Sequence, residues 1–283
     1  MTRFIRHYLL ALQFFTRIPV TGRLAEWVGF SPELLRASAA HFPGVGVLVG
    51  AVAAAVFALL QIGLPTTSFT PLVAAALSTV VSVLLTGGFH EDGLADVADG
   101  LGGSYQRERA LEIMKDSRVG AFGAMALVLV LLCKVALLAL LASVQVLPTA
   151  GGAAPFIGWY ACAALWIGHV VSRGLPLLLI RWLPHVGDQA TSKSKPLADQ
   201  ISATSLWVAV FWCFMALALA SLALGTINLI VACGFAGLAL LVMLRFFKRR
   251  LQGFTGDCLG TAQQVCEIAF YLGLSMALGA LQP

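Results

Sequence analysis

Long apolar runs separated by short polar loops constrain this chain more than any other feature of its sequence. A helix needs about 20 mainly apolar residues to cross a bilayer. We therefore predict an all-α fold, a polytopic integral membrane helix bundle that forms one domain over residues 1–283. About seven transmembrane helices are predicted, with these approximate bounds: Phe42–Ile62, Thr70–Leu85, Val119–Ala142, Phe156–Ile180, Leu206–Leu224, Ile227–Leu244 and Val265–Leu281.

The composition supports a membrane protein. Of the 283 residues, 59% are hydrophobic and 11% are charged, whereas about 25% of the residues in a soluble domain are charged. So few polar side chains cannot cover a globular surface in water, and much of the exterior is expected to face the lipid bilayer.

The N-terminal segment resembles a secretory signal only in part. Arg3 and Arg6 precede an apolar run that is short, breaks at Gln13 and Arg17, and lacks a small-residue cleavage site. We expect this segment to be retained as an interfacial or partly buried helix.

The distribution of basic residues predicts the orientation in the membrane. Lysine and arginine occur before the first predicted span and after the second, fourth and sixth, whereas residues 63–69, 143–155 and 225–226 contain none. The positive-inside rule then places the N-terminus in the cytoplasm and the C-terminus outside. The net charge of +5 thus lies on one membrane face and requires no nucleic-acid partner.

The acidic residues follow the basic ones, although the positive-inside rule does not require it. All 13 of them fall in or beside segments predicted to be cytoplasmic, and many lie between Glu91 and Asp116. We therefore expect the chemistry of this protein to take place at the cytoplasmic surface.

The stretch LLTGGFHEDGLADVADGLGG carries Asp92, Asp96 and Asp99, which would share one face of a helix. Three carboxylates at this spacing repel one another unless a cation lies between them, and Mg²⁺ prefers such oxygen ligands. A solvated acidic helix start is the alternative. The scarcity of acids elsewhere and the surrounding glycines, which permit close backbone approach, favour a metal-phosphate site. His90 is the candidate general base or phosphate donor.

The following segment, RERALEIMKDSRVGAFG, interleaves Glu112 and Asp116 with Lys115 and Arg118. Mixed charges at this spacing usually form surface ion pairs. Beside the three aspartates, they would also supply further metal ligands and cations for phosphate oxygens. Both interpretations remain open.

Two further regions supply candidates. Asp257 lies between glycine-rich flanks and is either a turn residue or a second metal ligand on the same membrane side as Asp92. Charges inside spans are functional hypotheses because they are costly there. Arg173 lies toward the cytoplasmic end of its span and could reach phosphate, whereas Lys134 and His169 fit structural roles equally well.

One reaction, a displacement at a diphosphate, would use all of these candidate residues. Magnesium held by carboxylates would neutralise phosphate charge, and arginine and lysine would stabilise the transferred and leaving oxygens. The pattern of residues does not name the two molecules that are joined.

The chain resembles the cobalamin synthase family of adenosylcobinamide-GDP ribazoletransferases. The resemblance rests on the stretch from Leu84 to Gly103 and on LEIMKDSRVGAFG, FFTRIPV, HFPGVGVLVG, SRG and TGDCLG, and it spans the whole chain. It implies a magnesium-dependent transferase of cobalamin biosynthesis, multi-pass in the bacterial cytoplasmic (inner) membrane, with its active site facing the cytoplasm. Such an enzyme joins adenosylcobinamide-GDP to α-ribazole or α-ribazole 5′-phosphate and releases GMP.

The resemblance also assigns residues. It implies catalytic or metal-binding roles for Asp92, Asp96, Asp99 and His90, supporting metal ligands at Glu112, Asp116 and Asp257, and phosphate contacts at Arg17, Lys115, Arg118 and Arg173. Glu91 and Gly44 depart from the pattern, because an apolar residue and a larger aliphatic residue are expected there. Oligomerisation and association with other corrinoid-assembly enzymes are left open.

Three other classes compete with this interpretation. Membrane prenyltransferases hold magnesium diphosphate with two aspartate-rich motifs, and here the second would be the sparse region around Asp257. The DVADG stretch echoes the start of the CDP-alcohol phosphotransferase motif, but its later aspartates do not follow in register. A cation transporter would place carboxylates near the middle of the membrane, whereas this sequence places them toward one edge.

Overall fold

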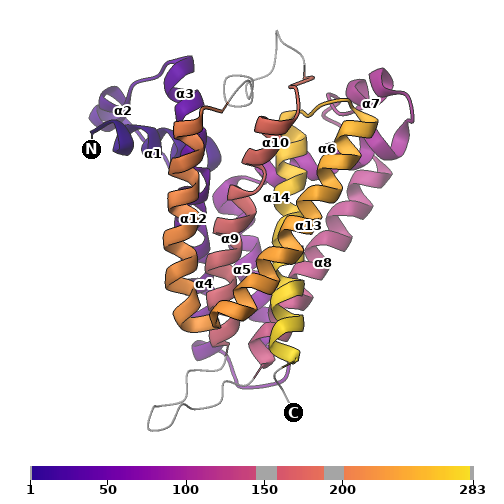
Figure 1. Cartoon of the computed structure of the whole chain (residues 1–283). Helices are drawn as coiled ribbons and strands as arrows, with labels where there is room; N and C mark the ends of the chain where they lie inside the picture. The colour runs from indigo at the N-terminus through magenta and orange to yellow at the C-terminus, as the bar shows by residue number, and fades with distance from the viewer. Residues whose placement is uncertain (1, 145–157, 188–200, 281–283) are drawn as a thin grey trace.

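The computed structural model describes residues 2–144, 158–187 and 201–280. In this part of the chain the named elements are all helices, which confirms the all-α prediction. The long helices run side by side as a bundle (Figure 1). They are α4 (Phe42–Gly63), α5 (Thr70–Thr86), α8 (Ala121–Ser143), α9 (Trp159–Gly174), α12 (Ala203–Leu224), α13 (Thr226–Arg250) and α14 (Gly256–Gly279).

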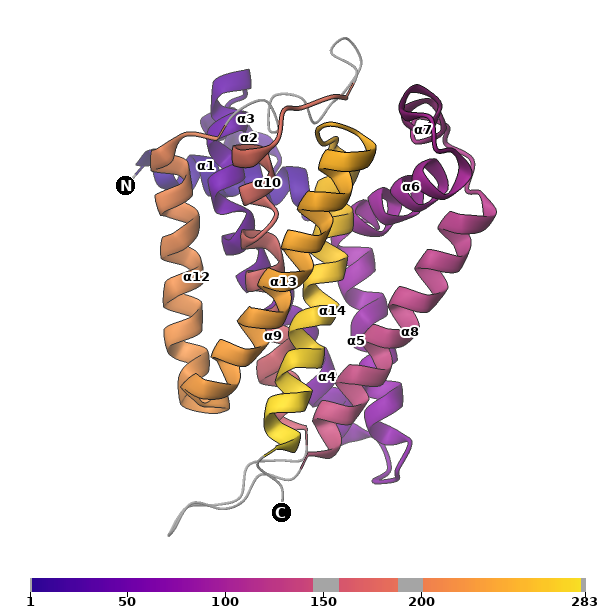
Figure 2. The same ribbon diagram turned by 45° about the vertical axis from the view of Figure 1, so that its right-hand side comes forward.

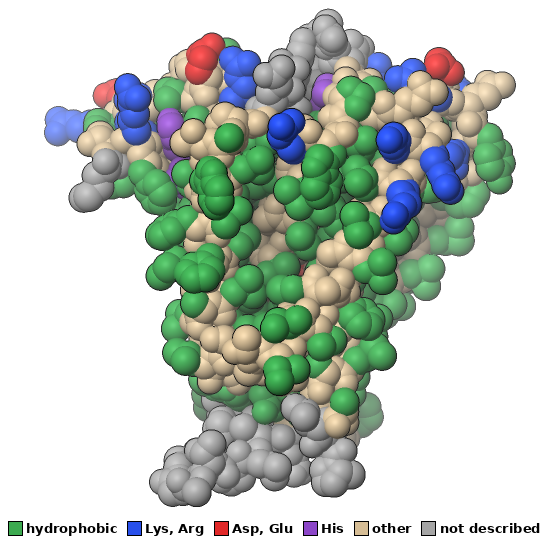
Figure 3. Space-filling model, in the orientation of Figure 1, with side chains coloured by type: hydrophobic (Ala, Val, Ile, Leu, Met, Phe, Trp, Pro, Cys, Tyr) green, Lys and Arg blue, Asp and Glu red, His purple; other side chains and the backbone are tan. Residues whose placement is uncertain are grey.

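Short helices gather at one end of this bundle (Figures 1 and 2). They are α1 (Thr2–Phe15), α2 (Gly22–Val28), α3 (Pro32–Ser38), η1 (Ala39–His41), α6 (Phe89–Gly103), α7 (Arg107–Ile113) and α10 (Leu177–Trp182). Lysine, arginine and acidic side chains lie at the same end, while hydrophobic side chains cover the flank seen in Figure 3. We call this the charged end.

The count of seven spans is not confirmed. Among the described residues, five helical segments are long and apolar enough to cross a membrane, or six if the bent pair α5 and α6 counts as one. The predicted span Val265–Leu281 begins inside α14, which is long but is not among the five, and its predicted end, Leu281, lies outside the described residues. Phe156, the predicted start of another span, lies outside the described residues. The length and apolar composition of these helices nonetheless indicate a multi-pass membrane protein.

Two consecutive glycines turn the chain at the charged end. Gly87 and Gly88 have φ of 69° and 70°, a left-handed conformation that glycine adopts without steric cost. The Gly88 amide donates to Val83 O at 2.9 Å and closes the end of α5. As a result, α6 leaves α5 at an angle of 90° and does not continue the span.

The α1 helix is partly buried, as predicted. Leu10, Ala11, Leu12 and Phe15 are buried against the bundle. Phe4, in the first turn of this helix, is 38% exposed and meets the His41 ring edge to face with centroids 4.5 Å apart.

Glycines allow α4 to approach α9 closely. A Cβ on Gly46 would lie 2.3 Å from His169 O, and one on Gly50 would lie 2.7 Å from Trp166 O. Small residues at such crossings let helix backbones pack tightly in membranes. Gly44, which departs from the family pattern, faces Trp212, because a Cβ there would lie 2.6 Å from the indole ring.

Candidate active site

The crossing of α6 and α14 brings distant acidic residues together. A Cβ on Gly93 would lie 2.9 Å from Asp257 O, and one on Gly260 would lie 3.2 Å from the His90 backbone. The Thr261 hydroxyl donates to Gly93 O at 3.0 Å and ties the two helices together. Asp257, in the first turn of α14, is therefore held beside the acidic face of α6.

Asp92, Asp96 and Asp257 form the acidic cluster of this crossing. The segment from Asp92 to Asp99 is helical and lies within α6, the condition under which the sequence places its aspartates on one face. Burial, followed by the charges of Asp257, Asp92 and Asp99, raises the pKa of Asp96 to about 7. Burial and then the charge of Asp92 raise the pKa of Asp257 to about 6, against the hydrogen bond from Thr255. These carboxylates repel one another and would be stabilised by a cation.

The cluster fits magnesium with water or phosphate in its coordination shell. No group of three or more histidine, cysteine or acidic side chains within the described ranges is arranged to hold an ion by itself. Mg²⁺ does not need such a cage, because it keeps several waters and uses one or two carboxylates together with substrate phosphates. Asp92, Asp96 and Asp257 are therefore suitable ligands for a magnesium–diphosphate complex.

Asp99 has a different environment. Its Oδ2 accepts a hydrogen bond from the Gly120 amide at 2.7 Å, and its Oδ1 accepts one from the Gly123 amide at 2.8 Å. A Cβ on either glycine would lie within 2.4 Å of this carboxylate. Asp99 thus caps the N-terminus of α8, where the helix dipole favours a negative charge. Its role as a metal ligand stays a prediction.

A groove of about 650 Å³ is lined by Arg17 and by Asp92, the member of the acidic cluster that reaches it. The Arg17 amide donates to Leu85 O at 2.7 Å. Its guanidinium stem lies over Gly87, where a Cβ would come within 2.1 Å of Nε. Gly87 therefore also leaves room for the Arg17 side chain. Phosphate binding by Arg17 stays a prediction.

The candidates around α7 form exposed ion pairs. Arg109 Nη1 lies 2.6 Å from Glu112 Oε2, and Arg118 Nη2 lies 2.5 Å from Asp116 Oδ2. Hydrogen bonds from Arg118 lower the pKa of Asp116 to about 2. Lys115 is exposed on the same segment. The surface-pair interpretation therefore accounts for these contacts, and metal or phosphate binding by the segment stays a prediction.

Arg173 and His90 lie inside the protein and do not line this groove. Arg173 Nη1 lies 2.8 Å from His169 Nδ1, and the Arg173 Cζ lies 5.7 Å from the centre of the Phe42 ring. The His90 ring stacks on Phe42 with centroids 5.6 Å apart. Burial lowers the pKa of His90 well below its ordinary value, so its imidazole is neutral. A direct phosphate contact by Arg173 stays a prediction.

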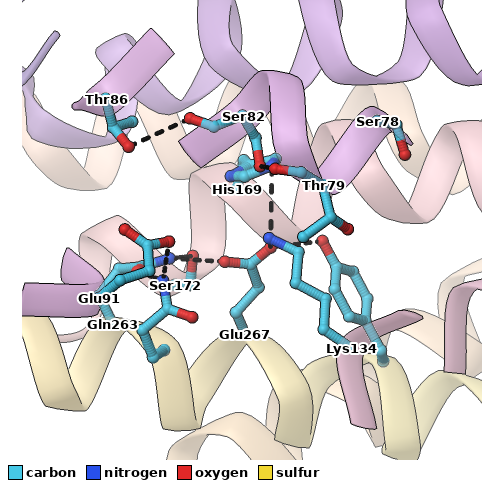
Figure 4. A network of polar contacts seen from close by, with 12 residues as sticks. Ser78, Thr79, Ser82, Thr86, Glu91, Lys134, His169, Ser172, Gln263 and Glu267 are labelled. Atoms are coloured by element: carbon cyan, nitrogen blue, oxygen red, sulfur yellow. Dashed lines mark hydrogen bonds and ion pairs between the residues drawn. The ribbon is translucent and has the colours of Figure 1, made fainter. Parts of the chain in front are cut away.

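A buried polar network extends from the acidic helix into the bundle. Glu267 accepts from Lys134 Nζ at 2.8 Å, from Gln263 Nε2 at 2.7 Å and from the Tyr271 hydroxyl at 2.8 Å. Figure 4 shows the Glu267 carboxylate between Lys134 and Gln263. Sequence reasoning left Lys134 and Glu267 unconnected and placed Glu267 near the start of a span. The lysine inside an apolar run was the signal that an acid faces it.

Glu91 connects α6 to this network. Gln264 Nε2 donates to Glu91 Oε1 at 2.9 Å and to Gln263 Oε1 at 3.0 Å. The acid that departs from the family pattern therefore has a buried partner on α14. The hydrogen bond from Gln264 therefore holds Glu91, the residue before Asp92, in position.

The fold and the site define a class: a helical, multi-pass membrane protein with carboxylates and an arginine lining a groove at one end of its bundle. A model of the family "Cobalamin-5-phosphate synthase" matches residues 7–275. This chain belongs to that family.

Curated relatives agree with the family model. The adenosylcobinamide-GDP ribazoletransferase of Polaromonas naphthalenivorans is 78% identical over 278 residues, which cover 98% of this chain and 100% of the relative. The protein of the same name from Albidiferax ferrireducens is 62% identical over 293 residues, which cover 98% of this chain and 100% of the relative. No solved structure matches the chain.

Proposed function

We propose that this chain catalyses the adenosylcobinamide-GDP ribazoletransferase reaction of cobalamin biosynthesis. It joins adenosylcobinamide-GDP to α-ribazole or its 5′-phosphate and releases GMP. The family and the full-length relatives support this function. The observation in the structure that carries it is the gathering of Asp92, Asp96 and Asp257, of which Asp92 lines a groove together with Arg17.

The reaction is a displacement at phosphorus. The ribose hydroxyl of α-ribazole attacks the phosphorus attached to cobinamide, a new O–P bond forms, and the bond to GMP breaks. Asp92, Asp96 and Asp257 would hold Mg²⁺, which supplies neutralisation of the diphosphate charge. Arg17 would contact the phosphate oxygens in the groove. His90 was predicted to accept the hydroxyl proton; it does not line the groove, and this role stays a prediction.

We further propose that the charged end faces the cytoplasm and that the protein lies in the bacterial inner membrane. The basic last turn of α13, with Lys248, Arg249 and Arg250, supports this orientation through the positive-inside rule. The groove lined by Arg17 and Asp92, called the acidic groove below, would then open to the compartment that contains soluble nucleotide substrates.

A cation transporter would need a free carboxylate near the middle of the membrane to bind its ion, and the main candidate for that ligand is already paired. Glu267 is an acid far inside a helix, but Lys134, Gln263 and Tyr271 already donate to it. A carboxylate with these three donors is not a vacant ligand for a passing cation.

Protein in lipid nanodiscs tests the proposal. GMP release should require adenosylcobinamide-GDP, α-ribazole and Mg²⁺ together, and the corrinoid product should carry the ribazole. Release of GMP without α-ribazole, or full turnover in rigorously metal-stripped samples, would contradict the proposed reaction or its metal dependence respectively. Turnover of a prenyl diphosphate or a CDP-alcohol instead would support one of the alternatives.

A further inference from the structure

A second cavity lies at the charged end. It adjoins the start of α6 on the side of this helix opposite to Asp92. Four phenylalanines line it, together with His90 and the backbone of α14 at Gly256 and Gly260. The space free of atoms amounts to about 480 Å³, but only about 30 Å³ of it admits the centre of a water molecule. The cavity is therefore narrow and almost wholly apolar, which does not suit a phosphate or a metal ion.

The aromatic rings of this cavity differ in how firmly they are held. Phe15 and Phe42 stack with centroids 4.3 Å apart, and both are buried, at 7% and 4% exposure. Phe89 is 38% exposed and meets Phe14, which is partly buried, edge to face at 5.8 Å. Phe15 and Phe42 thus form the more buried wall, and a flat ligand would enter only if the less buried rings of Phe14 and Phe89 turned aside.

One polar group lines this apolar cavity. The His90 side chain is 1% exposed, and its Nε2 is buried without a hydrogen-bond partner among the described residues. Its ring lies nearly parallel to Phe42, at 15°. Buried polar atoms normally have partners, and a ligand with one matching polar atom would supply the partner that Nε2 lacks.

The cavity adjoins the acidic groove. Phe14 and Phe89 line both the cavity and the groove that contains Arg17 and Asp92. A molecule whose flat ring occupies the cavity would therefore emerge between these two rings beside the diphosphate site.

We propose that this cavity binds the fused aromatic base of α-ribazole. The benzimidazole ring lies between the phenylalanine rings, and its free ring nitrogen accepts a hydrogen bond from the Nε2–H of His90. The ribose then passes Phe14 and Phe89, and its hydroxyl faces the phosphorus beside Asp92. This inference rests on the proposed function and assigns His90 to base recognition in place of proton transfer.

Direct binding of α-ribazole to the protein in nanodiscs, measured by calorimetry without the donor or Mg²⁺, tests the cavity. Ala39 lines it and is 2% exposed, so Ala39→Leu should fill it and weaken α-ribazole binding at least tenfold. The KM for α-ribazole should rise and that for adenosylcobinamide-GDP should not. Ala25→Leu is the matched control, because Ala25 lines a separate cavity beside α1, and it should bind α-ribazole like the wild type.

A ligand lacking the ring nitrogen tests the role of His90. The wild type should prefer α-ribazole over the corresponding indole riboside by about three- to tenfold, the usual effect of one hydrogen bond. His90→Leu should lose this preference, whereas His90→Gln, which keeps an N–H donor, should retain part of it. A fall in kcat with unchanged KM for α-ribazole in both variants would instead make His90 the general base and overturn the assignment.

The outcomes separate this inference from the proposed function. If the wild type neither binds α-ribazole nor releases GMP, the proposed function fails. If the wild type does both and Ala39→Leu binds α-ribazole as tightly as Ala25→Leu, the base lies elsewhere. If Ala39→Leu does not fold, Leu259→Ala provides a second test, because Leu259 lines the same cavity and its truncation widens it. This variant should bind a riboside with a bulkier fused base more tightly than the wild type does. An unchanged preference between α-ribazole and the bulkier riboside would overturn the proposal.

Discussion

The acidic side chains near α6 do not share one environment. Asp92 is exposed and Asp96 is half-buried, whereas Asp99 is buried and capped into α8. The i, i+4, i+7 spacing in the sequence predicted three equivalent ligands. The contacts with Gly120 and Gly123 distinguish Asp99, and those glycines belong to the segment for which surface ion pairs and metal or phosphate binding were both left open.

Asparagine substitutions should separate these roles. Asp92→Asn, Asp96→Asn and Asp257→Asn should each reduce kcat by about 10²–10³-fold, as removal of one electrostatic contact in an active site does, with little loss of thermal stability. Asp99→Asn replaces one acceptor oxygen by an amide and should destabilise the protein by about 0.5–2 kcal/mol. Steady-state kinetics and thermal unfolding measure both effects. Wild-type turnover by an Asp92, Asp96 or Asp257 variant would remove that residue from the ligand set.

The carboxyl pKa values predict how stability depends on pH. The pKa of Asp96 is about 7 and that of Asp257 is about 6, both above the ordinary value of 3.8. The folded state therefore holds these protons more tightly than the unfolded chain, and this contribution to stability is lost as the pH rises through 6 to 7.

Metal-free protein should accordingly unfold at a lower temperature at pH 8 than at pH 5.5, and Mg²⁺ should raise the unfolding temperature mainly at pH 8. Asp96→Asn should reduce this pH dependence. Thermal unfolding in both buffers measures the effect, and equal stabilisation by Mg²⁺ at the two pH values would argue against carboxylate ligands.

Among the helices, the crossing of α6 and α14 decides where the site forms. It depends on glycines that let the two backbones touch and on the turn at Gly87 and Gly88 that directs α6 across the charged end. Hydropathy predicted that a helix ends near Leu85, but the 90° bend comes from two left-handed residues.

Gly93→Ala should separate these helices. The added methyl group would lie 2.9 Å from Asp257 O, a backbone atom that cannot move aside. We expect at least a tenfold loss of activity and a weaker response to Mg²⁺, because Asp257 moves away from Asp92. Gly234→Ala is the control: a Cβ there meets nothing within 4 Å, and alanine is favourable in a helix. Equal activity of the two variants would show that the close crossing is not required.

At the scale of the whole molecule, the Lys134–Glu267 pair is a charge contact buried inside the bundle, with side chains 2% and 1% exposed. Removing one partner leaves the other charge buried and uncompensated, which typically costs about 3–5 kcal/mol. The pair joins α8 to α14, and its loss is therefore expected to loosen the bundle more than the groove.

We expect Lys134→Met and Glu267→Gln each to lower the unfolding temperature strongly, and the double variant to be more stable than the sum of the two effects predicts. Thermal unfolding in one detergent measures this coupling. Strict additivity would show that the two side chains do not act as a pair. The exposed pair Arg36 and Glu33 serves as the control, since substitutions there should change stability by less than 1 kcal/mol.

The sequence by itself determined that this is a helical membrane protein with its acidic residues concentrated near one end, and it supplied Asp92, Asp96, Asp257 and Arg17 as candidate site residues. Hydropathy and helical periodicity are local properties, so they are readable along the chain. Only the tertiary structure decided that Asp257 lies with Asp92 and Asp96 and that Gln264 binds Glu91. These contacts join residues far apart in the chain, because they depend on which helices cross and on the glycines that allow the crossings.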